Sequence, residues 1–269
     1  MKIKDRVAVV TGAGGGIGWA LCRRFAREGA RAVALADLSG SPDKAAELAG
    51  EHPQLQTLGI DLDVSDGSAL EAAIERIESE VGPIDLFCSN AGISTRGGVV
   101  RTTDEDWERI LDINLMAHVY AARALVPKMI ERGGGYLLNT ASAAGLLSQI
   151  GSVGYAVSKH AAVALAEYLS ITYGERGLKV SVLCPQAVRT NMTAGTPGGG
   201  VAGVDGMMEP EEVAEAVIQG LDDERFLILP HPVVQEYIQR KAGNYDRWLS
   251  GMRGLRTRYV ETMGLDDEG

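Results

Sequence analysis

The feature that most constrains the fold of this chain is a glycine-rich loop at residues 11–18, with the sequence TGAGGGIG. The loop follows an apolar run at residues 7–11 and precedes residues 17–28, whose apolar side chains recur at helical spacing. A helix that begins directly after such a loop presents free backbone N–H groups and the positive end of its dipole. Because glycines also leave room for close approach, we interpret the loop as a pyrophosphate-binding turn between a strand and a helix.

Apolar runs alternate with amphipathic stretches through the first 230 residues. Strands are predicted at residues 7–11, 32–36, 57–60, 84–89, 136–140, 179–184 and 226–229, and helices at 17–28, 42–50, 65–80, 103–131, 152–174 and 210–221. We expect Ser65 to cap its helix. We expect the long helix at 103–131 to break near 112–114, and Pro127 to kink it or to start a new turn. This order predicts an α/β, three-layer, doubly wound Rossmann fold with a parallel seven-stranded sheet.

The sequence predicts two parts of unequal size. Residues 1–230 form the Rossmann domain, and residues 231–269 form a helical C-terminal extension. Residues 231–258 carry six basic and two acidic side chains and include Tyr237, Tyr245 and Trp248. Because the apolar residues of the extension have helical spacing, we expect it to pack on the same domain or on a neighbouring subunit. A helix that binds a membrane or an anionic partner, and a cover over a substrate pocket, are the alternatives.

Composition narrows the range of partners. The net charge of -10 opposes binding to nucleic acid, and no segment has the length or character of a transmembrane helix or a signal peptide. The three cysteines and four histidines lack the spacing of a disulfide framework or a metal site. We therefore expect a cytoplasmic protein that holds no metal, has no membrane or nucleic-acid partner and acts on a small molecule.

Polar residues follow the predicted strands, where a doubly wound sheet binds its ligands. Asp37 closes the second apolar run, nineteen residues after Gly18. A carboxylate there can accept both hydroxyls of an adenosine ribose and would repel a 2′-phosphate. Neither Gly15 nor Leu38 supplies a basic side chain for such a phosphate, so the sequence favours NAD over NADP.

The most specific pattern is Tyr155 with Lys159, which share one helix face at spacing i, i+4. An ammonium close to a phenol favours the phenolate and lowers its pKa, which makes Tyr155 a candidate general acid and base. Ser142 stands at the end of a strand thirteen residues earlier and can donate to the same substrate oxygen.

Taken together, these motifs resemble the short-chain dehydrogenase/reductase family over roughly residues 5–230. The matching segments are TGAGGGIG at 11–18, Asp37, DV at 63–64, NAG at 90–92, Asn114, Ser142, YxxxK at 155–159 and PQAVRT at 185–190. One departure is Gln186, because the family commonly has glycine after this proline. We expect Gln186 to face the substrate pocket as a hydrogen-bonding residue.

The resemblance implies a role for each matching residue. Tyr155 would exchange the proton of the substrate, Ser142 would orient the substrate oxygen, Lys159 would hold the nicotinamide ribose, and Asn114 would kink its helix and hold a water of the proton relay. The implied NAD contacts are Gly12, Gly16, Ile17 and Gly18 at the pyrophosphate, Asp37 at the ribose, Asp63 and Val64 at the adenine, Asn90 and Gly92 on the floor, and Pro185, Val188 and Thr190 at the carboxamide, with Tyr155 and Lys159.

The implied function is the interconversion of a secondary alcohol and a ketone by an NAD-dependent oxidoreductase. An epimerase or dehydratase of the same fold and a non-catalytic nucleotide sensor are the alternatives. Glycine-rich residues 195–206 are expected to form a mobile lid. The candidate substrate contacts are Ser94, Leu146, Gln149, Gln186 and Met192, a mainly apolar set that favours an alicyclic, aromatic or medium-chain substrate. The family also implies a homo-oligomer, a tetramer or a dimer built on the two long helices.

Overall fold

Seven parallel strands form one sheet in the computed structural model, which describes residues 1–263. The strands lie in the order β3-β2-β1-β4-β5-β6-β7. Their bounds are β1 Val7–Thr11, β2 Ala32–Asp37, β3 Gln56–Asp61, β4 Leu86–Ser89, β5 Gly135–Thr140, β6 Leu178–Leu183 and β7 Leu227–Ile228. The order reverses between β1 and β4, so this sheet has the switch point at which doubly wound folds bind ligands. The predicted Rossmann fold is confirmed.

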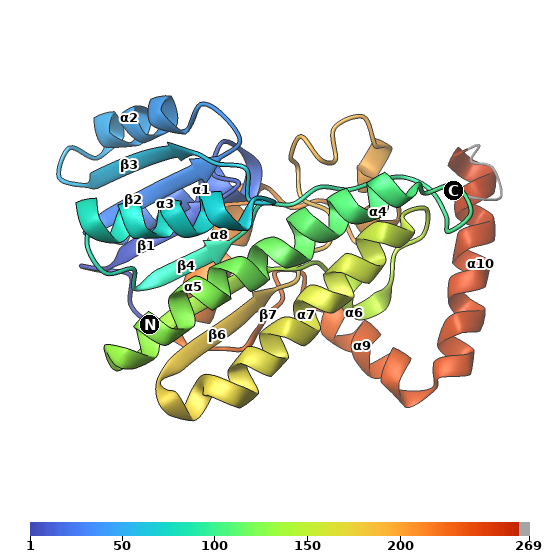
Figure 1. Ribbon diagram of the computed structural model, residues 1–269. Helices are drawn as coiled ribbons and strands as arrows, with labels where there is room; N and C mark the ends of the chain where they lie inside the picture. The colour runs from blue at the N-terminus through green and yellow to red at the C-terminus, as the bar shows by residue number, and fades with distance from the viewer. Residues whose placement is uncertain (264–269) are drawn as a thin grey trace.

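Helices connect the strands and cover both faces of the sheet (Figure 1). Their bounds are α1 Gly16–Arg27, α2 Ser41–Glu51, α3 Gly67–Glu80, α4 Asp104–Leu111, α5 Ala117–Glu131, α6 Ala144–Leu147, α7 Val153–Tyr173, α8 Pro210–Asp222, α9 Val233–Gly243 and α10 Tyr245–Met263. Short 3-10 segments occupy Gly174–Arg176 and Pro197–Gly203.

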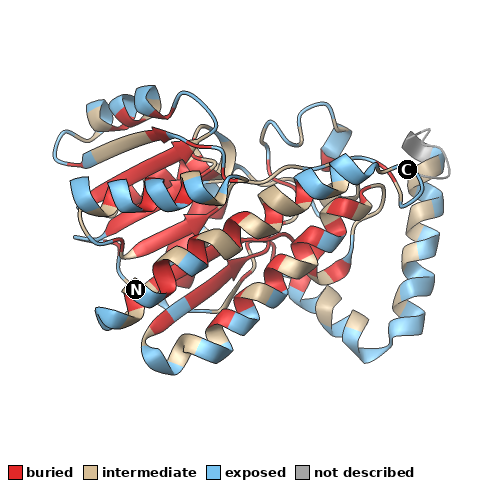
Figure 2. Ribbon diagram, in the orientation of Figure 1, coloured by how far each residue is buried: buried red, intermediate tan, exposed pale blue. Residues whose placement is uncertain are grey.

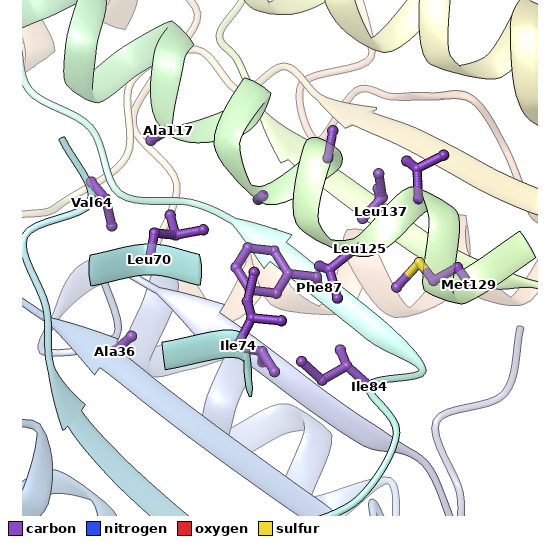
Figure 3. Close-up of a cluster of buried hydrophobic side chains, with 14 of the residues drawn as sticks. Ala36, Val64, Leu70, Ile74, Ile84, Phe87, Ala117, Leu125, Met129 and Leu137 are labelled. Atoms are coloured by element: carbon purple, nitrogen blue, oxygen red, sulfur yellow. The ribbon is translucent and has the colours of Figure 1, made fainter. Parts of the chain in front are cut away.

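Alternate residues of the inner strands enter two separate hydrophobic cores. In β1, Val7 and Val9 pack with α3, α5 and α7, whereas Ala8 and Val10 pack with α1, α2 and α8. Figure 3 shows the first core around Phe87. Because both faces are covered, the inner strands are rich in apolar residues and are the most deeply buried part of the chain, whereas the edge strand β3 is mostly half-buried or exposed (Figure 2).

Three local details refine the sequence analysis. The break expected near residue 112 is a π-helical turn, η1 Asp112–Met116, which joins α4 to α5. The helix α5 continues past Pro127 to Glu131. The expected cap Ser65 was wrong: Asp66 caps α3 by accepting from Ser68 N and Ala69 N, while the Ser65 hydroxyl donates to Asp63 Oδ1 over 2.6 Å.

The C-terminal helices differ from each other in burial. On α9, Val234 is fully buried and packs with Ala143 and Leu147 beside α6. In contrast, α10 lies along the far side of the molecule from β3 and is mostly exposed or half-buried (Figures 1 and 2). The acidic end of the predicted extension, residues 264–269, lies outside the described residues. Among the described helices, none is both long enough and apolar enough to cross a membrane.

Candidate active site

One cavity of about 680 Å³ lies at the carboxyl ends of the strands. It brings together nearly all of the residues that the sequence predicts for the site. Those lining it are Gly12, Gly16, Ile17, Gly18, Asp37, Asp63, Val64, Asn90, Gly92, Ser94, Ser142, Gln149, Tyr155, Lys159, Pro185, Gln186, Val188, Thr190 and Met192. Two predicted residues, Asn114 and Leu146, do not line it.

The glycine loop closes so tightly that side chains are excluded from it. A Cβ atom at Gly18 would lie 2.0 Å from the carbonyl oxygen of Gly12, and Gly12 itself has a φ of +67°. Gly15 is the N-cap of α1 and no side chain caps this helix, so the N–H groups of its first turn face the cavity without a side-chain acceptor. These features fit a pyrophosphate at the N-terminus of α1.

Asp37 ends β2 with its carboxylate held against the glycine loop. Its Oδ2 accepts from Gly14 N at 2.7 Å, and its Oδ1 accepts from Leu38 N at 2.7 Å. Each oxygen retains acceptor capacity toward the cavity, because a carboxylate oxygen can accept more than one hydrogen bond. The position and chemistry therefore suit a ligand that carries neighbouring hydroxyl groups.

Asn90 joins the ends of three neighbouring strands. Its side-chain amide donates to Thr11 O at 3.0 Å, and its Oδ1 accepts from Thr140 Oγ1 at 3.2 Å. Its backbone N–H donates to Thr11 Oγ1 at 2.9 Å. Asn90 thus fixes the floor of the cavity where β1, β4 and β5 end.

Ser142 and Tyr155 face each other across the cavity from β5 and α7. Desolvation raises the pKa of Tyr155, while a side-chain hydrogen bond with Ser142 acts in the lowering direction. The raised pKa is contrary to the lowering that the sequence predicts, because desolvation of the phenol has the largest influence on it. The Lys159 ammonium lies 5.7 Å from the centroid of the Tyr155 ring.

Lys159 is buried below the tyrosine, with 3% of its surface exposed. Its Nζ donates to Thr140 O at 2.9 Å, a contact that fixes the side chain against the end of β5. Burial lowers the pKa of Lys159 to about 8, since desolvation penalises the charged form.

The π turn buries Asn114 completely and directs its amide toward the loop after β4. Its Oδ1 accepts from Ile93 N at 2.8 Å, and its Nδ2 donates to Ile93 O at 2.9 Å and to Ser158 Oγ at 3.1 Å. Asn114 therefore ties together this loop and α7. One turn later, burial lowers the pKa of His118 to about 3, so this imidazole is neutral.

At the other end of the cavity, four of the five candidate substrate residues line the wall, namely Ser94, Gln149, Gln186 and Met192. Leu146 departs from the expectation. It lies on α6, and its side chain packs among the hydrophobic clusters around Leu147 and Val234. The turn of α6 after β5 directs it away from the cavity.

Arg109 and Thr193 are among the lining residues that the sequence reasoning missed. Arg109 of α4 reaches the cavity close enough to lower the pKa of Asp63, although the Ser65 hydrogen bonds to that carboxylate lower it more. Thr193 donates to Val188 O at 2.7 Å and accepts from Thr190 N at 3.1 Å, which shapes the segment after β6. No short-range pattern marks Arg109, whereas the three threonines at 190, 193 and 196 could have indicated Thr193. Within residues 1–263, no group of three or more His, Cys, Asp or Glu side chains is placed to hold a metal ion.

Comparison with known proteins places this geometry in a family. The short chain dehydrogenase family model matches residues 6–197. The chain is 38% identical over 233 residues to 1-deoxy-11-beta-hydroxypentalenate dehydrogenase of Streptomyces exfoliatus, covering 85% of this chain and 84% of the relative. It is 34% identical over 197 residues to meso-2,3-butanediol dehydrogenase of Serratia marcescens, covering 73% and 77%.

Solved structures agree with this assignment. A short chain dehydrogenase/reductase from Burkholderia phymatum, in complex with NAD, superposes with a TM-score of 0.82 at 25% identity and covers 91% of this chain and 96% of its own. A short-chain dehydrogenase from Sphingobium yanoikuyae, in complex with NADPH, gives 0.76 at 26% identity and covers 94% and 95%. The chain belongs to the short-chain dehydrogenase/reductase family. It is an oxidoreductase that acts on CH–OH groups.

Proposed function

We propose that this protein interconverts a secondary alcohol and a ketone with NAD(H). The observation that carries the proposal is the placement of Ser142, Tyr155 and Lys159 in the same cavity as the glycine loop and Asp37. Alcohol oxidation requires a hydride acceptor, which the cofactor bound through the glycine loop would supply, and a proton acceptor, which the tyrosine supplies. The nicotinamide ring, when bound, supplies the hydride chemistry.

Tyr155 is the proposed general acid and base. In alcohol oxidation its phenolic oxygen takes the hydroxyl proton of the substrate, and in ketone reduction it returns a proton to the carbonyl oxygen. The Ser142 hydroxyl donates to the same oxygen and stabilises the negative charge that develops there. Besides the hydrogen bond with Tyr155, this hydroxyl makes a long donation to Pro185 O at 3.4 Å and accepts from Ala144 N at 3.1 Å, so a stronger acceptor can redirect its hydrogen.

Lys159 and Asn114 are the proposed inner end of the proton path. The Lys159 ammonium, fixed on Thr140 O, would hold a ribose hydroxyl beside Tyr155, and its positive charge would oppose the rise that desolvation causes in the pKa of the tyrosine. Asn114 keeps the π turn and the loop after β4 in register with α7. An ordered water at this turn would pass the proton onward.

The proposed cofactor contacts follow the order of the strand ends. The N-terminus of α1 binds the pyrophosphate, Asp37 the adenosine ribose and the segment after β3 the adenine, while the ends of β4 and β6 hold the nicotinamide side. The residues are Gly12, Gly16, Ile17, Gly18, Asp37, Asp63, Val64, Asn90, Gly92, Pro185, Val188 and Thr190, with Tyr155 and Lys159. The negative charge of Asp37 supports NAD over NADP, because it would repel a 2′-phosphate.

The substrate is proposed to be a small secondary alcohol or its ketone. Two relatives have names that point to such substrates, a hydroxypentalenate dehydrogenase and a butanediol dehydrogenase. The mixed lining of Ser94, Gln149, Gln186 and Met192 supports this size class.

We also propose an organisation for the protein. Residues 1–230 form the catalytic domain, and residues 195–206 form its lid. The working form is a homo-oligomer, a tetramer or a dimer, in the cytoplasm.

A cofactor and substrate screen tests the proposal. The purified chain is mixed with a panel of secondary alcohols and either NAD⁺ or NADP⁺, and the absorbance of the reduced cofactor is followed. The expected result is alcohol-dependent reduction of NAD⁺ with kcat/KM at least about tenfold above that with NADP⁺. Equal use of NADP⁺ would contradict the role of Asp37, and epimerised or dehydrated products without reduced cofactor would contradict the reaction.

A further inference from the structure

A chain of polar side chains stands at the substrate end of the cavity. Gln186, which follows β6, lines the cavity, and its Nε2 donates to Asp205 Oδ2 at 3.0 Å. Asp205 belongs to the glycine-rich segment before α8. The Tyr237 hydroxyl of α9 donates to Asp205 Oδ1 at 3.0 Å. Three segments that are far apart in sequence thus meet at one wall.

The Asp205 contact fixes which way the amide of Gln186 points. A carboxylate only accepts hydrogen bonds, so the NH₂ group must face Asp205 and the amide oxygen must face away. This Oε1 is shielded from solvent and has no hydrogen-bond partner among the described residues. In this conformation a hydroxyl in the cavity cannot contact the oxygen, so binding requires a rotation of the side chain that exposes it. Because a buried acceptor without a donor is unfavourable, such a rotation replaces an unpaired acceptor with a paired one.

The backbone of Gln186 is fixed as well. Its N–H donates to His231 Nδ1 at 3.2 Å, which requires the neutral ring tautomer with the proton on Nε2. Burial lowers the pKa of His231 and favours this neutral form. Gln186 has no positive φ, so glutamine fits here without strain. The amide is therefore held at both its backbone and its side chain before any substrate arrives.

We propose that Gln186 Oε1 accepts a hydrogen bond from a second hydroxyl group of the substrate, so that the preferred substrates are diols, polyols or their hydroxyketones. This inference rests on the proposed function. Asp205 does not itself line the cavity, but it holds the NH₂ group of Gln186, so the remaining polar atom of this amide is an acceptor that suits an O–H donor.

Matched alcohols test the proposal. Initial rates with NAD⁺ are measured for sec-butanol against meso-2,3-butanediol, and for cyclohexanol against its vicinal cis-diol. In the wild type we expect kcat/KM for the diol to exceed that for the monoalcohol by about tenfold in at least one pair, the size of one well-placed hydrogen bond. In Gln186→Leu, which keeps the bulk of the side chain but has no acceptor, this ratio falls to about one.

Two further variants serve as a control and as a second test of the Gln186 amide. Gln219→Leu removes an exposed glutamine of α8 that lies outside the cavity, and its diol ratio should equal that of the wild type. In Asp205→Asn the new side chain can both donate and accept, so the Gln186 amide can turn round. The diol-to-monoalcohol ratio of kcat/KM should therefore fall in this variant too, which provides a test even if Gln186→Leu does not fold. A wild-type ratio near one in both pairs, or a ratio that survives Gln186→Leu, overturns the inference and leaves the proposed function intact. Oxidation of no alcohol in either pair overturns both.

Discussion

The two ends of the cavity are built in different ways. The cofactor end is made of backbone, close glycine contacts and the short bonds of Asp37 and Asn90, all within the turns that follow β1, β2 and β4. The substrate end is made of side chains from separate segments, joined through Gln186, Asp205 and Tyr237. Backbone contacts close the cofactor end tightly, whereas the shape of the substrate end depends on contacts between side chains of separate segments. We therefore expect the class of reaction and the choice of substrate to depend on different kinds of contact.

The largest effect is expected at the boundary between the two ends. Tyr155→Phe removes the proton-transferring oxygen but keeps the ring, so kcat should fall by about a thousandfold. Cofactor affinity should stay close to that of the wild type, because the glycine loop and Asp37 are untouched. Steady-state kinetics and a titration of NADH fluorescence measure the two quantities separately. Retention of wild-type kcat would contradict the catalytic role of Tyr155.

The second effect concerns the stability cost of the buried ammonium. The pKa of Lys159 is about 8 in the folded protein against an ordinary value of 10.5, so Lys159→Met should raise the free energy of unfolding at pH 7 by up to about 3 kcal/mol, reduced by the lost hydrogen bond to Thr140. Between pH 8 and 10.5 the unfolded wild type binds more protons than the folded wild type, so the unfolding free energy of the wild type increases as the pH rises. The stability advantage of Lys159→Met over the wild type therefore becomes smaller across this range.

Urea unfolding of both proteins across this pH range checks the prediction. Lys179→Met, at a half-exposed lysine paired with Glu224, controls for the loss of one positive charge. A difference between Lys159→Met and the wild type that stays constant from pH 7 to 10.5 would be incompatible with a buried, destabilised ammonium.

The third prediction tests the close packing of the glycine loop at the cofactor end. In Gly18→Ala the new methyl group would meet the Gly12 carbonyl at 2.0 Å, so the turn must open. We expect a loss of about 2 kcal/mol in unfolding free energy and weaker NADH binding. In Gly50→Ala a methyl group in α2 meets nothing within 4 Å, so this control should be neutral or slightly stabilising. Equal thermal midpoints for the two variants would show that the turn tolerates a side chain.

The smallest effect is expected at Asp37. Replacing it with alanine removes two acceptors and the charge that repels a 2′-phosphate, so the ratio of kcat/KM for NAD⁺ to that for NADP⁺ should fall by about tenfold. Asp43→Ala, on the first turn of α2, serves as a nearby control that changes the same charge. An unchanged ratio in Asp37→Ala would place cofactor selection elsewhere, for example at Arg109, which also lines the cavity.

The sequence predicts the cofactor end of the cavity far better than the substrate end, for a physical reason. Strands buried on both faces are continuous apolar runs, and the residues that follow them are brought together by the sheet alone. The wall at Gln186 depends on Asp205 and Tyr237, which no local pattern pairs with it. Leu146 was misplaced because the direction of a side chain after a strand depends on the turn that follows, here α6.

Finer details escaped the sequence for the same reason. Ser65 and Asp66 are both good N-cap residues, and only the bond from Ser65 to Asp63 leaves Asp66 as the cap. The raised pKa of Tyr155 follows from the desolvation of its hydroxyl, which is not visible in the spacing of Tyr155 and Lys159.

The most direct test of the account follows a single hydrogen atom. A secondary alcohol deuterated at its carbinol carbon is oxidised with NAD⁺, and the reduced cofactor and the ketone are analysed by mass spectrometry. If hydride passes directly from substrate to cofactor while Tyr155 takes the hydroxyl proton, each turnover places one deuterium in the reduced cofactor and none in the solvent. Deuterium released to water, or product formed without reduced cofactor, would contradict the account.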